Sequence, residues 1–582
     1  MPSQPINLDG VNPIGRVTAV DTARAFINVD DHDELMNVIV GNLLAIQGSI
    51  GHQFLIAIVE RITRLPGEEF EVLGTEAIEE TLEPEDLKDN IRGVLVGTYW
   101  TDRGGSGPVF QRGAKSCPQI DSACYILKGA NLSAFMGTLS GGIAQEVELE
   151  LGHYVIDPSA RAVADGNRFF QRHAAILGST GAGKSWTVAL LLEKAKSLCY
   201  PNLIVLDMHG EYSSLCKGEH GYATQMRIAG PGDLTYPSGN TIFLPYWLLN
   251  REEMLSMLLD RSDQNAPNQA AVFTDLVRRH KDAFLEGANK KDVRATFTVD
   301  SPIPYDLDAV LAELEQKDTE MVPGAGSRSV KGQLNGKLTR FISRFKAKIV
   351  DRRYGFMFSP PKDAQSYNWL PELAKRLLGS DSERPGIKIL DLSEVPSDVL
   401  PIVAGVFARL VFDIQFWMKP KHRTPVCLVC DEAHQYLPVR GEADSPSRRA
   451  LESFERIAKE GRKYGLSILV ASQRPSDVSR TILSQCNNFI VLRLTNVQDQ
   501  SAIKSVMPDS MAAITDVLPL LDVGEALILG DAVLLPSRVQ LHKPRVKPLS
   551  LTKDFWSEWN ELSPDPAAIE NGVEAMRRQN RG

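Results

Sequence analysis

The sequence has few cysteines, and the seven that it has are odd in number and scattered along 582 residues. Such a set cannot form the disulfide framework of a small secreted protein, so we expect a reducing compartment. Two of the cysteines form a C-x-x-C, but it lies inside the apolar run PVCLVC. There the residues are better explained as small buried side chains than as a metal or redox pair; they are Cys427 and Cys430.

The sequence also lacks long apolar runs and a surplus of positive charge. Nowhere do 18 apolar residues follow one another, so we expect no membrane span. The first residues, MPSQPINLDG, do not have the basic and apolar regions of a signal peptide. We therefore expect a cytoplasmic protein. The formal net charge of -9 gives no general sign of nucleic-acid binding, although the wall of a channel can be basic while the outer surface is acidic.

Residues 1–155 read as short β segments separated by turn residues. The segments RVTAV, RAFINV, QFLIAIVERI, RGVLVGTYW and QEVELELG carry alternating or β-branched apolar residues. Several short strands at this spacing predict a small N-terminal β-barrel. No catalytic constellation appears in this region, so we expect it to be structural.

From residue 156 onwards strands alternate with helices, which predicts an α/β core with a mostly parallel sheet and helices on both of its faces. The first part of this core covers residues 156–250. Residues 251–385 lose the β signal and predict a helical insertion, with a linker at 322–329. The core resumes over 386–545, and 546–582 predict a helical tail.

The sequence GSTGAGKS, from Gly178 to Ser185, fits the P-loop pattern and lies between a predicted strand and a predicted helix. Its glycines let backbone N–H groups turn towards phosphate oxygens at the helix N-terminus. Lys184 adds a positive charge at the β- and γ-phosphates, and the Ser185 hydroxyl is a Mg²⁺ ligand. The pattern predicts ATP and Mg²⁺ as cofactors, with nucleotide contacts from Gly178, Ser179, Thr180, Gly181, Ala182, Gly183, Lys184, Ser185 and Trp186.

A second set of polar residues follows the predicted strand PVCLVC. Asp431 suits the outer shell around Mg²⁺, and Glu432 is the candidate base that orients or deprotonates the attacking water. Acidic residues at strand ends also serve as helix caps. However, phosphoryl transfer needs both a P-loop and an acid, which favours the catalytic role. His434 either couples this pocket to DNA or is an ordinary surface or packing histidine.

The segment ILVASQRP ends a further predicted strand in Ser472 and Gln473. The amide of Gln473 is placed to bind the γ-phosphate or the attacking water and thus to sense hydrolysis. The alternative is a turn residue whose amide binds backbone groups.

Five segments in this order resemble the HerA branch of the HerA/FtsK ATPases. They are LDMHGEY (206–212), DEAHQYLP (431–438), IAKEGRKYG (457–465), ASQRPSDV (471–478) and LILGDAVLLPSRV (527–539). The GRV start and FQRGAKSCPQI (110–120) are similar to the family's HAS-barrel. The resemblance covers residues 10–545 and implies a RecA-like core in a homo-hexamer that translocates or unwinds double-stranded DNA with a nuclease partner.

The resemblance also implies roles for single residues. Lys184 and Ser185 match the Walker A positions, Asp431 and Glu432 the Walker B positions, and Gln473 the sensor. Two arginines look like the residues that reach the nucleotide of a neighbouring subunit, where they would make hydrolysis depend on assembly; they are Arg172 and Arg462. A strand-edge salt bridge and a surface helix end are the respective alternatives. The resemblance further assigns an acidic turn to Asp207 and Glu211.

Other functions stay open. A pump of the FtsK or conjugative-coupling kind would bring a membrane segment or a winged-helix DNA reader, and neither is visible. The chain could instead be a ring that recruits and activates an effector, either a nuclease or an NAD-consuming enzyme, without sustained movement.

Two basic features have two explanations each. Arg340, Arg344, Lys348 and Arg352 recur every four residues opposite an apolar face. They either contact DNA phosphates or form a solvated face. The segment 438–450, PVRGEADSPSRRA, either lines a pore or is a surface loop.

Overall fold

A computed structural model describes residues 5–21, 23–29, 35–36, 38–48, 53–66, 87–101, 107–114, 116–235, 237–323, 329–379, 386–441, 445–506, 509–549, 555–561 and 563–578. The chain divides into two compact units. Unit 1 contains residues 1–194, 473–476 and 486–543, and unit 2 contains 195–472, 477–485 and 544–582. The sequence crosses between them several times, so each unit collects segments that are distant in the chain.

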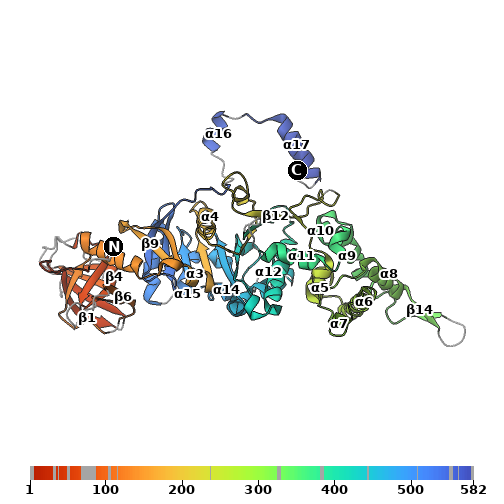
Figure 1. The fold of residues 1–582 in the computed structure, drawn as a ribbon, viewed down its shortest axis with the longest axis horizontal. Coiled ribbons are helices and arrows are strands. Elements are labelled where there is room, and N and C mark those ends of the chain that lie inside the picture. Colours follow the sequence, from red (N-terminus) through yellow and green to blue (C-terminus); the bar gives the residue numbers. More distant parts are fainter. Residues whose placement is uncertain are drawn as a thin grey trace. The chain divides into compact units, whose positions relative to one another are not determined.

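Unit 1 begins with the predicted barrel (Figure 1). Its strands follow the order β2-β1-β7-β3-β4-β5, and a β2–β5 pairing closes it. Alternate side chains fill the interior, among them Ile27, Leu44 and Ile91, each with no exposed surface. β6 extends from β5, and the helix α2 (Gly129–Gly141) follows the barrel. The strand bounds are β1 (Gly15–Asp21), β2 (Arg24–Val29), β3 (Leu43–Gln47), β4 (Gln53–Pro66), β5 (Leu87–Thr101), β6 (Pro108–Arg112) and β7 (Ala123–Ile126).

One predicted barrel strand belongs elsewhere. QEVELELG contributes to β8 (Glu148–Tyr154), which pairs with β9 (Asp157–Asp165) and β21 (Ser537–Leu541) in the second sheet of unit 1. The expectation that it is part of the barrel was wrong, because alternation identifies a strand without identifying its sheet. The strands β3, β6 and β7 were missed; they have only 5, 5 and 4 residues.

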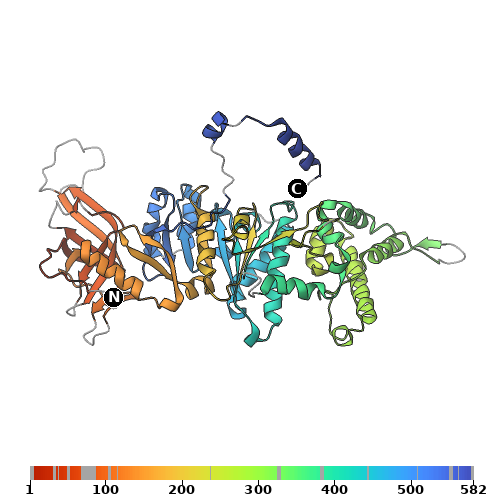
Figure 2. The ribbon, with the colours of Figure 1, turned by 45° about the horizontal axis from the view of Figure 1, so that its top comes forward.

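The second sheet of unit 1 runs in the order β10-β19-β20-β21-β8-β9. β10 (Ala174–Leu177) and β19 (Asn488–Val491) are parallel, while β20 (Glu525–Gly530) and the strands after it pair antiparallel. Strands near the start of the chain therefore lie beside strands near its end (Figure 2). The helix α3 (Gly166–Gln171) precedes β10, and α4 (Lys184–Ala195) follows it.

Unit 2 holds the parallel strands that the sequence predicted. Their order is β13-β12-β16-β11-β17-β18, and neighbouring strands in this order pair in parallel. β11, β17 and β18 are buried along their whole length, as expected for strands covered on both faces. The bounds are β11 (Leu203–Asp207), β12 (Thr224–Ile228), β13 (Thr241–Ile242), β16 (Ile387–Asp391), β17 (Val426–Cys430) and β18 (Leu466–Ser472).

The helix α12 (Leu400–Trp417) is long and apolar enough to cross a membrane by composition alone. However, 72% of it is buried inside the protein. It carries Arg409, which binds the Glu253 carboxylate through Nε at 2.6 Å, and it lies beside α13 (Ser445–Glu460). These contacts are those of a core helix.

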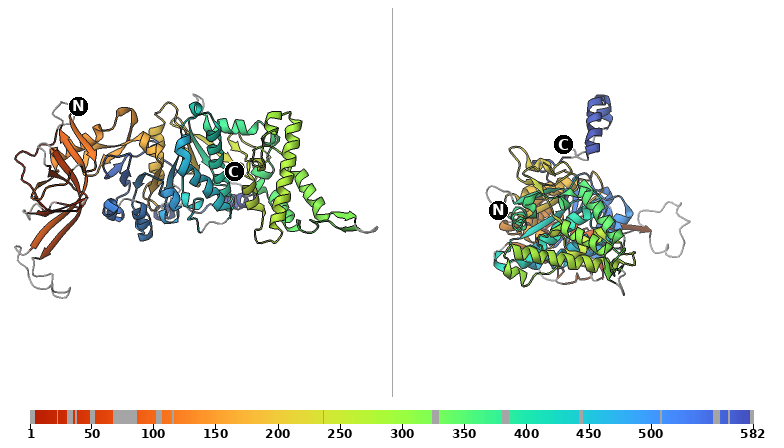
Figure 3. Two further views of the ribbon diagram at one scale, coloured as in Figure 1. Left: turned by 90° about the horizontal axis from the view of Figure 1, so that it is seen from below. Right: turned by 90° about the vertical axis from the view of Figure 1, so that its right-hand side faces the viewer.

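The helical insertion is confirmed (Figure 3). At the ends of the predicted linker 322–329, β14 (Met321–Pro323) pairs antiparallel with β15 (Ser329–Lys331); residues 324–328 lie outside the described residues. The helices α16 (Phe555–Glu561) and α17 (Pro566–Arg578) end unit 2. The insertion comprises α5 (Arg251–Leu258), α6 (Ala266–Gly287), α7 (Lys291–Arg294), α8 (Leu307–Thr319), α9 (Thr339–Val350), α10 (Gly355–Phe358) and α11 (Trp369–Leu378).

Candidate nucleotide site

In unit 1 the P-loop joins the end of β10 to the start of α4, which is the strand–loop–helix context that the pattern requires. Gly181 and Gly183 have φ values of 74° and 108°, which side-chain-bearing residues rarely adopt. A Cβ on Gly178 would lie 2.7 Å from the Leu492 side chain, so that glycine is needed for close packing. The glycines therefore set the curl of a loop that can cradle phosphates.

The lysine of the loop is buried and points back along it. Lys184 has 7% of its surface exposed, and its Nζ lies 3.5 Å from the Ser179 carbonyl oxygen. The Ser179 N–H donates to the Arg493 carbonyl at 2.9 Å, which ties the loop to the residues after β19. This arrangement holds an ammonium group within the loop, where an anionic ligand would complete its coordination.

The structure brings the candidate sensor to the P-loop. The Thr180 hydroxyl donates a hydrogen bond to the Gln473 side-chain oxygen, and both residues belong to unit 1. The amide of Gln473 is therefore at the edge of the loop that would hold the phosphates. Ser185 and Trp186, at the start of α4, are partly buried.

In unit 2 the two acidic residues lie at the end of β17. Asp431 is 3% exposed and Glu432 is 5% exposed. Glu432 has a φ of 43°, a left-handed conformation that costs about 1–3 kcal/mol in a residue other than glycine. The Tyr436 hydroxyl donates to the Asp431 carbonyl at 3.1 Å and fixes the turn. The backbone is thus held in a strained shape that orients the Glu432 carboxylate.

His434 lies between the acid and the end of the next strand. Its Nδ1 is 3.4 Å from a Glu432 carboxylate oxygen and 3.4 Å from the Ser472 hydroxyl. Ser472 is the last residue of β18 and directly precedes Gln473 in the sequence. His434 is therefore neither a bare surface residue nor a buried packing residue, since it connects the candidate base to the strand that leads to the candidate sensor.

The electrostatics of this turn fit a divalent cation. Burial, and then the neighbouring charges of Glu432, Asp207 and Glu211, raise the pKa of Asp431 well above its usual value. Gathering carboxylates in a buried place is unfavourable unless a cation neutralises them. Asp431 and the Ser185 hydroxyl, which were predicted as Mg²⁺ ligands, carry the hard oxygen atoms that Mg²⁺ prefers.

The acidic turn after β11 has a structural role. The Asp207 carboxylate accepts hydrogen bonds from four successive backbone N–H groups, those of residues 209–212, at 2.8–3.3 Å. Burial raises the pKa of Asp207 to about 6, against the lowering effect of those bonds. Asp207 therefore fixes the turn that carries Glu211, and its carboxylate is already engaged.

The two arginines of the prediction differ. The Arg172 guanidinium binds the Asp531 carboxylate of its own chain, which is the salt bridge named as its alternative. Arg462 lies exposed on the turn that precedes β18. Within the described part of the chain it makes no ion pair and no side-chain hydrogen bond, so its guanidinium can bind another group.

The remaining sequence candidates have ordinary surroundings. Cys427 and Cys430 are buried in β17, as expected. Along the basic stripe, Arg344 pairs with Asp260 at 2.7 Å and Lys348 lies 3.7 Å from Asp398. These contacts favour the explanation as a solvated face over the explanation as a row of cations that contact DNA phosphates. Of the segment 438–450, which was expected to line a pore or form a surface loop, residues 445–450 belong to the helix α13, and 442–444 lie outside the described residues.

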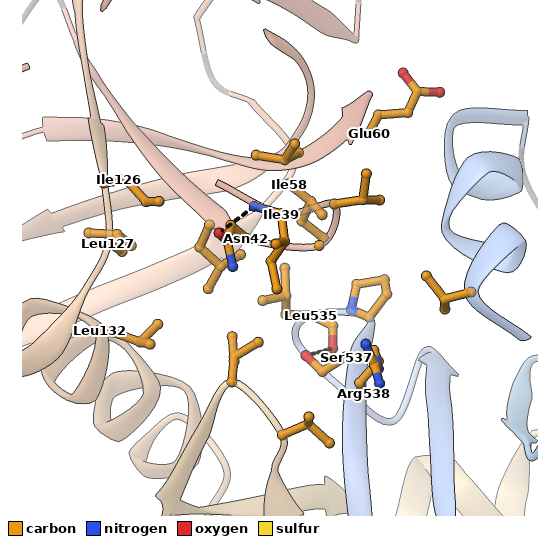
Figure 4. A pocket seen from close by; sticks show the side chains of 18 of the residues that line it. Ile39, Asn42, Ile58, Glu60, Ile126, Leu127, Leu132, Leu535, Ser537 and Arg538 are labelled. Carbon is orange, nitrogen blue, oxygen red and sulfur yellow. Dashed lines mark hydrogen bonds between the residues drawn. The ribbon is translucent and has the colours of Figure 1, made fainter. Parts of the chain in front are cut away.

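The sequence did not reveal a cleft of about 430 Å³ within unit 1, between the barrel and the β20–β21 region (Figure 4). Two of its charged side chains are bound within unit 1: Glu60 binds Arg24 and Arg92, and Arg538 binds Glu525; Lys128 also lines the cleft. The walls therefore present a mostly apolar surface; they include Ile39, Ile58, Leu127, Leu132, Val517 and Leu535.

Comparisons with known proteins agree on one family. Residues 149–411 match the model of the central domain of the helicase HerA. A probable helicase of Methanocaldococcus jannaschii, MJ1565, is 26% identical over 402 residues, which cover 68% of this chain and 67% of the relative. The DNA double-strand break repair helicase HerA of Pyrococcus furiosus is 26% identical over 426 residues, covering 68% and 69%.

Solved structures with a similar arrangement have lower identity. VirB4 of Thermoanaerobacter pseudethanolicus is 17% identical, with a TM-score of 0.47 over 69% of this chain and 98% of that one. The plasmid coupling protein TrwB, in complex with ADP and Mg²⁺, is 15% identical, with a TM-score of 0.42 over 74% and 94%.

Proposed function

We propose that this chain hydrolyses ATP and uses the energy to move along or unwind double-stranded DNA, because residues 149–411 match the model of the central domain of the helicase HerA. The observation that carries the proposal is the P-loop, with a buried lysine inside its curl and a glutamine amide bound to its threonine. The relatives named as DNA repair helicases support DNA as the substrate.

Each residue has a role in this reaction. Lys184 neutralises charge on the β- and γ-phosphates, and Gln473 reads whether the γ-phosphate is present. Ser185 and Asp431 would hold Mg²⁺, which neutralises phosphate charge when bound. Glu432 orients the attacking water and accepts its proton, and His434 keeps the Glu432 carboxylate in place at 3.4 Å.

An arginine from a second copy completes the site in this proposal. The exposed, unpaired state of Arg462 in the described residues supports a role across a subunit boundary. An arginine supplied in trans stabilises the charge of the transferred phosphoryl group and is worth roughly 10³–10⁵ in rate. A homo-hexameric ring is the assembly that we propose.

A second candidate function rests on the apolar cleft beside the barrel. A concave apolar surface of this size suits a protein partner. In this reading the ring assembles and activates an effector, a nuclease or an NAD-consuming enzyme, and ATP gates it without sustained translocation. ATP-dependent displacement of a DNA strand by the isolated protein separates the two functions, since the scaffold would hydrolyse ATP without displacing the strand.

The pocket is tested by two substitutions with matched controls. Lys184→Ala removes the phosphate-binding charge and should abolish tight ATP binding. Glu432→Gln should keep binding and lose about 10²–10⁴ in turnover. Lys217→Ala and Glu219→Gln, both exposed in unit 2, should leave binding and turnover unchanged. Near wild-type hydrolysis by Glu432→Gln would show that another group is the base.

A further inference from the structure

Three segments of unit 1 meet at one carboxylate, that of Asp531 in the turn between β20 and β21. Arg172, at the corner between α3 and β10, binds it directly. The Asn487 side chain, just before β19, donates to it at 3.3 Å. From the barrel, Arg112 at the end of β6 places a guanidinium nitrogen 3.8 Å from it. One carboxylate is thus shared by the barrel and the strands that support the P-loop.

The turn itself is tightly built. Gly530 has a φ of 128°, and a Cβ there would lie 2.2 Å from the Asn487 carbonyl oxygen, so only glycine fits. The Arg112 Nη1 donates to the Gly530 carbonyl at 2.9 Å, and the Asp531 N–H donates to the Asn487 carbonyl at 3.2 Å. Arg112 therefore binds both the backbone and the side chain of a turn that has little freedom to move.

The corner between α3 and β10 is also held by hydrogen bonds. The Asn488 side chain donates to the Arg168 carbonyl at 3.0 Å and accepts from the Ala532 N–H at 2.8 Å. His173 has a φ of 52°, in the left-handed region that residues other than glycine seldom adopt. These bonds join the turn after β20 to the corner before β10, so the two move together.

The corner lies at the base of the strand that ends in the P-loop. β10 has four residues and pairs in register with β19 from Ala174–Asn488 to Leu177–Val491. Gly178 follows at once. A stiff strand of this length spans about 13 Å, so a displacement at Arg172 passes along it to the phosphate-binding loop.

We propose that Arg112 is a positioning residue through which the barrel sets the rate of ATP turnover. It acts by sharing the Asp531 carboxylate with Arg172. When Arg112 is absent, the Gly530 carbonyl loses the Arg112 donor and Asp531 keeps only Arg172 and Asn487, so the corner before β10 relaxes. A protein bound to the barrel can therefore change turnover by moving β6. This inference rests on the proposed ATPase function.

The experiment measures kcat and KM for ATP with the full-length chain at concentrations where rings form. Arg112→Ala should lower kcat on the order of 3- to 10-fold, the size of effect seen for coupled neighbours, with KM for ATP within about twofold. Arg112→Lys, which keeps a positive charge near Asp531, should recover most of the loss. The control is Gln111→Ala, the exposed neighbour on β6, which should have no effect.

The decisive comparison is the double substitution. If both arginines act through Asp531, Arg112→Ala should cause no further loss in chains that already carry Arg172→Ala. Losses that multiply, an unchanged kcat for Arg112→Ala, or no recovery with Arg112→Lys would overturn the inference while leaving ATP hydrolysis intact. A wild-type chain without ATPase activity would overturn the proposed function, and this inference with it.

Discussion

Arg172, at the corner between α3 and β10, and Arg462, on the turn before β18, differ in what their guanidinium groups bind. Arg172 is about one-third exposed, and its guanidinium is committed to Asp531 of its own chain. Arg462 is exposed on a 3₁₀ turn of four residues, Gly461–Tyr464, between α13 and β18. No described carboxylate lies within ion-pair distance of it.

This difference indicates which guanidinium group is free to bind the nucleotide of a neighbouring subunit in the ring that we propose. For Arg172 to reach a neighbouring nucleotide, its salt bridge must first break, which leaves the partly buried Asp531 without its partner. Arg462 loses no such contact when it binds a phosphate. The sequence named both as candidates for a neighbour's nucleotide, with a salt bridge as the alternative for Arg172 and a surface helix end for Arg462. The salt bridge is present at Arg172, which leaves Arg462, exposed on its turn, as the candidate that we propose for the neighbour.

The largest expected effect on this comparison comes from Arg462→Ala. If its guanidinium stabilises the phosphoryl group in trans, kcat should fall about 10³-fold or more, with ATP still bound. ATP hydrolysis rates and binding of a fluorescent ATP analogue measure the two quantities. The adjacent Lys463→Ala is the matched control, because Lys463 is also an exposed cation on this turn and should tolerate the change. Equal losses in both variants would argue for a general effect of charge.

A smaller effect is expected at the other arginine. Arg172→Ala leaves Asp531 with Asn487 and the more distant Arg112, so we expect a loss of about 1–2 kcal/mol in the unfolding free energy of unit 1. The loss in kcat should be about tenfold or less. Urea unfolding and steady-state ATPase assays check these values. A kcat loss as large as that of Arg462→Ala, with unchanged stability, would mean that Arg172 also reaches the neighbour's nucleotide.

The last effect is on stability alone, without an expected change in turnover, and concerns a cation that no carboxylate of the described residues binds directly. Lys281 in α6 is 1% exposed, and its Nζ donates to the Val299 and Ser301 carbonyls, each at 2.7 Å. Burial lowers the pKa of Lys281 from 10.5 to about 8. Between pH 8 and 10.5 the unfolded state therefore binds more protons than the folded state, so Lys281 makes the unfolding free energy rise with pH.

The measurement compares urea midpoints of the wild type and Lys281→Met between pH 7.5 and 10. The wild type should gain roughly 1–3 kcal/mol relative to the variant over this range. Identical pH profiles would show that Lys281 stays protonated when buried. The result would show how far two carbonyl groups, with the Tyr305 ring and the charge of Asp300 nearby, can stabilise a buried cation in this fold.

The elements of the core could be predicted because their sequence signals are local. The P-loop pattern specifies a strand, a curled loop and a helix within some twenty residues, and the buried runs of β11, β17 and β18 leave no other interpretation. The barrel could be predicted as a class, since alternating segments recur along 1–101. Which strands belong to the barrel could not be predicted. The residues of β8 alternate in the same way as the barrel strands, yet β8 pairs with β21, nearly 400 residues later in the sequence.

The ion-pair and hydrogen-bond partners of the charged residues could not be predicted from the sequence. Asp531 is an unremarkable acid in a turn until the fold places Arg172 and Arg112 beside it. Asp207 was expected in an acidic turn, and the fold adds that four backbone N–H groups of this turn donate to its carboxylate. Both outcomes depend on contacts between residues close in space, and periodicity carries no information about them.

The measurement that tests the central claim most directly mixes two inactive proteins. Arg462→Ala chains keep Glu432, and Glu432→Gln chains keep Arg462. If each site takes its base from one chain and its arginine from the next, mixed rings contain some complete sites, and ATPase activity should return on mixing. If both groups serve within one chain, each protein lacks an essential group at every site. The absence of rescue, in mixtures where native mass spectrometry detects mixed rings, would contradict the account.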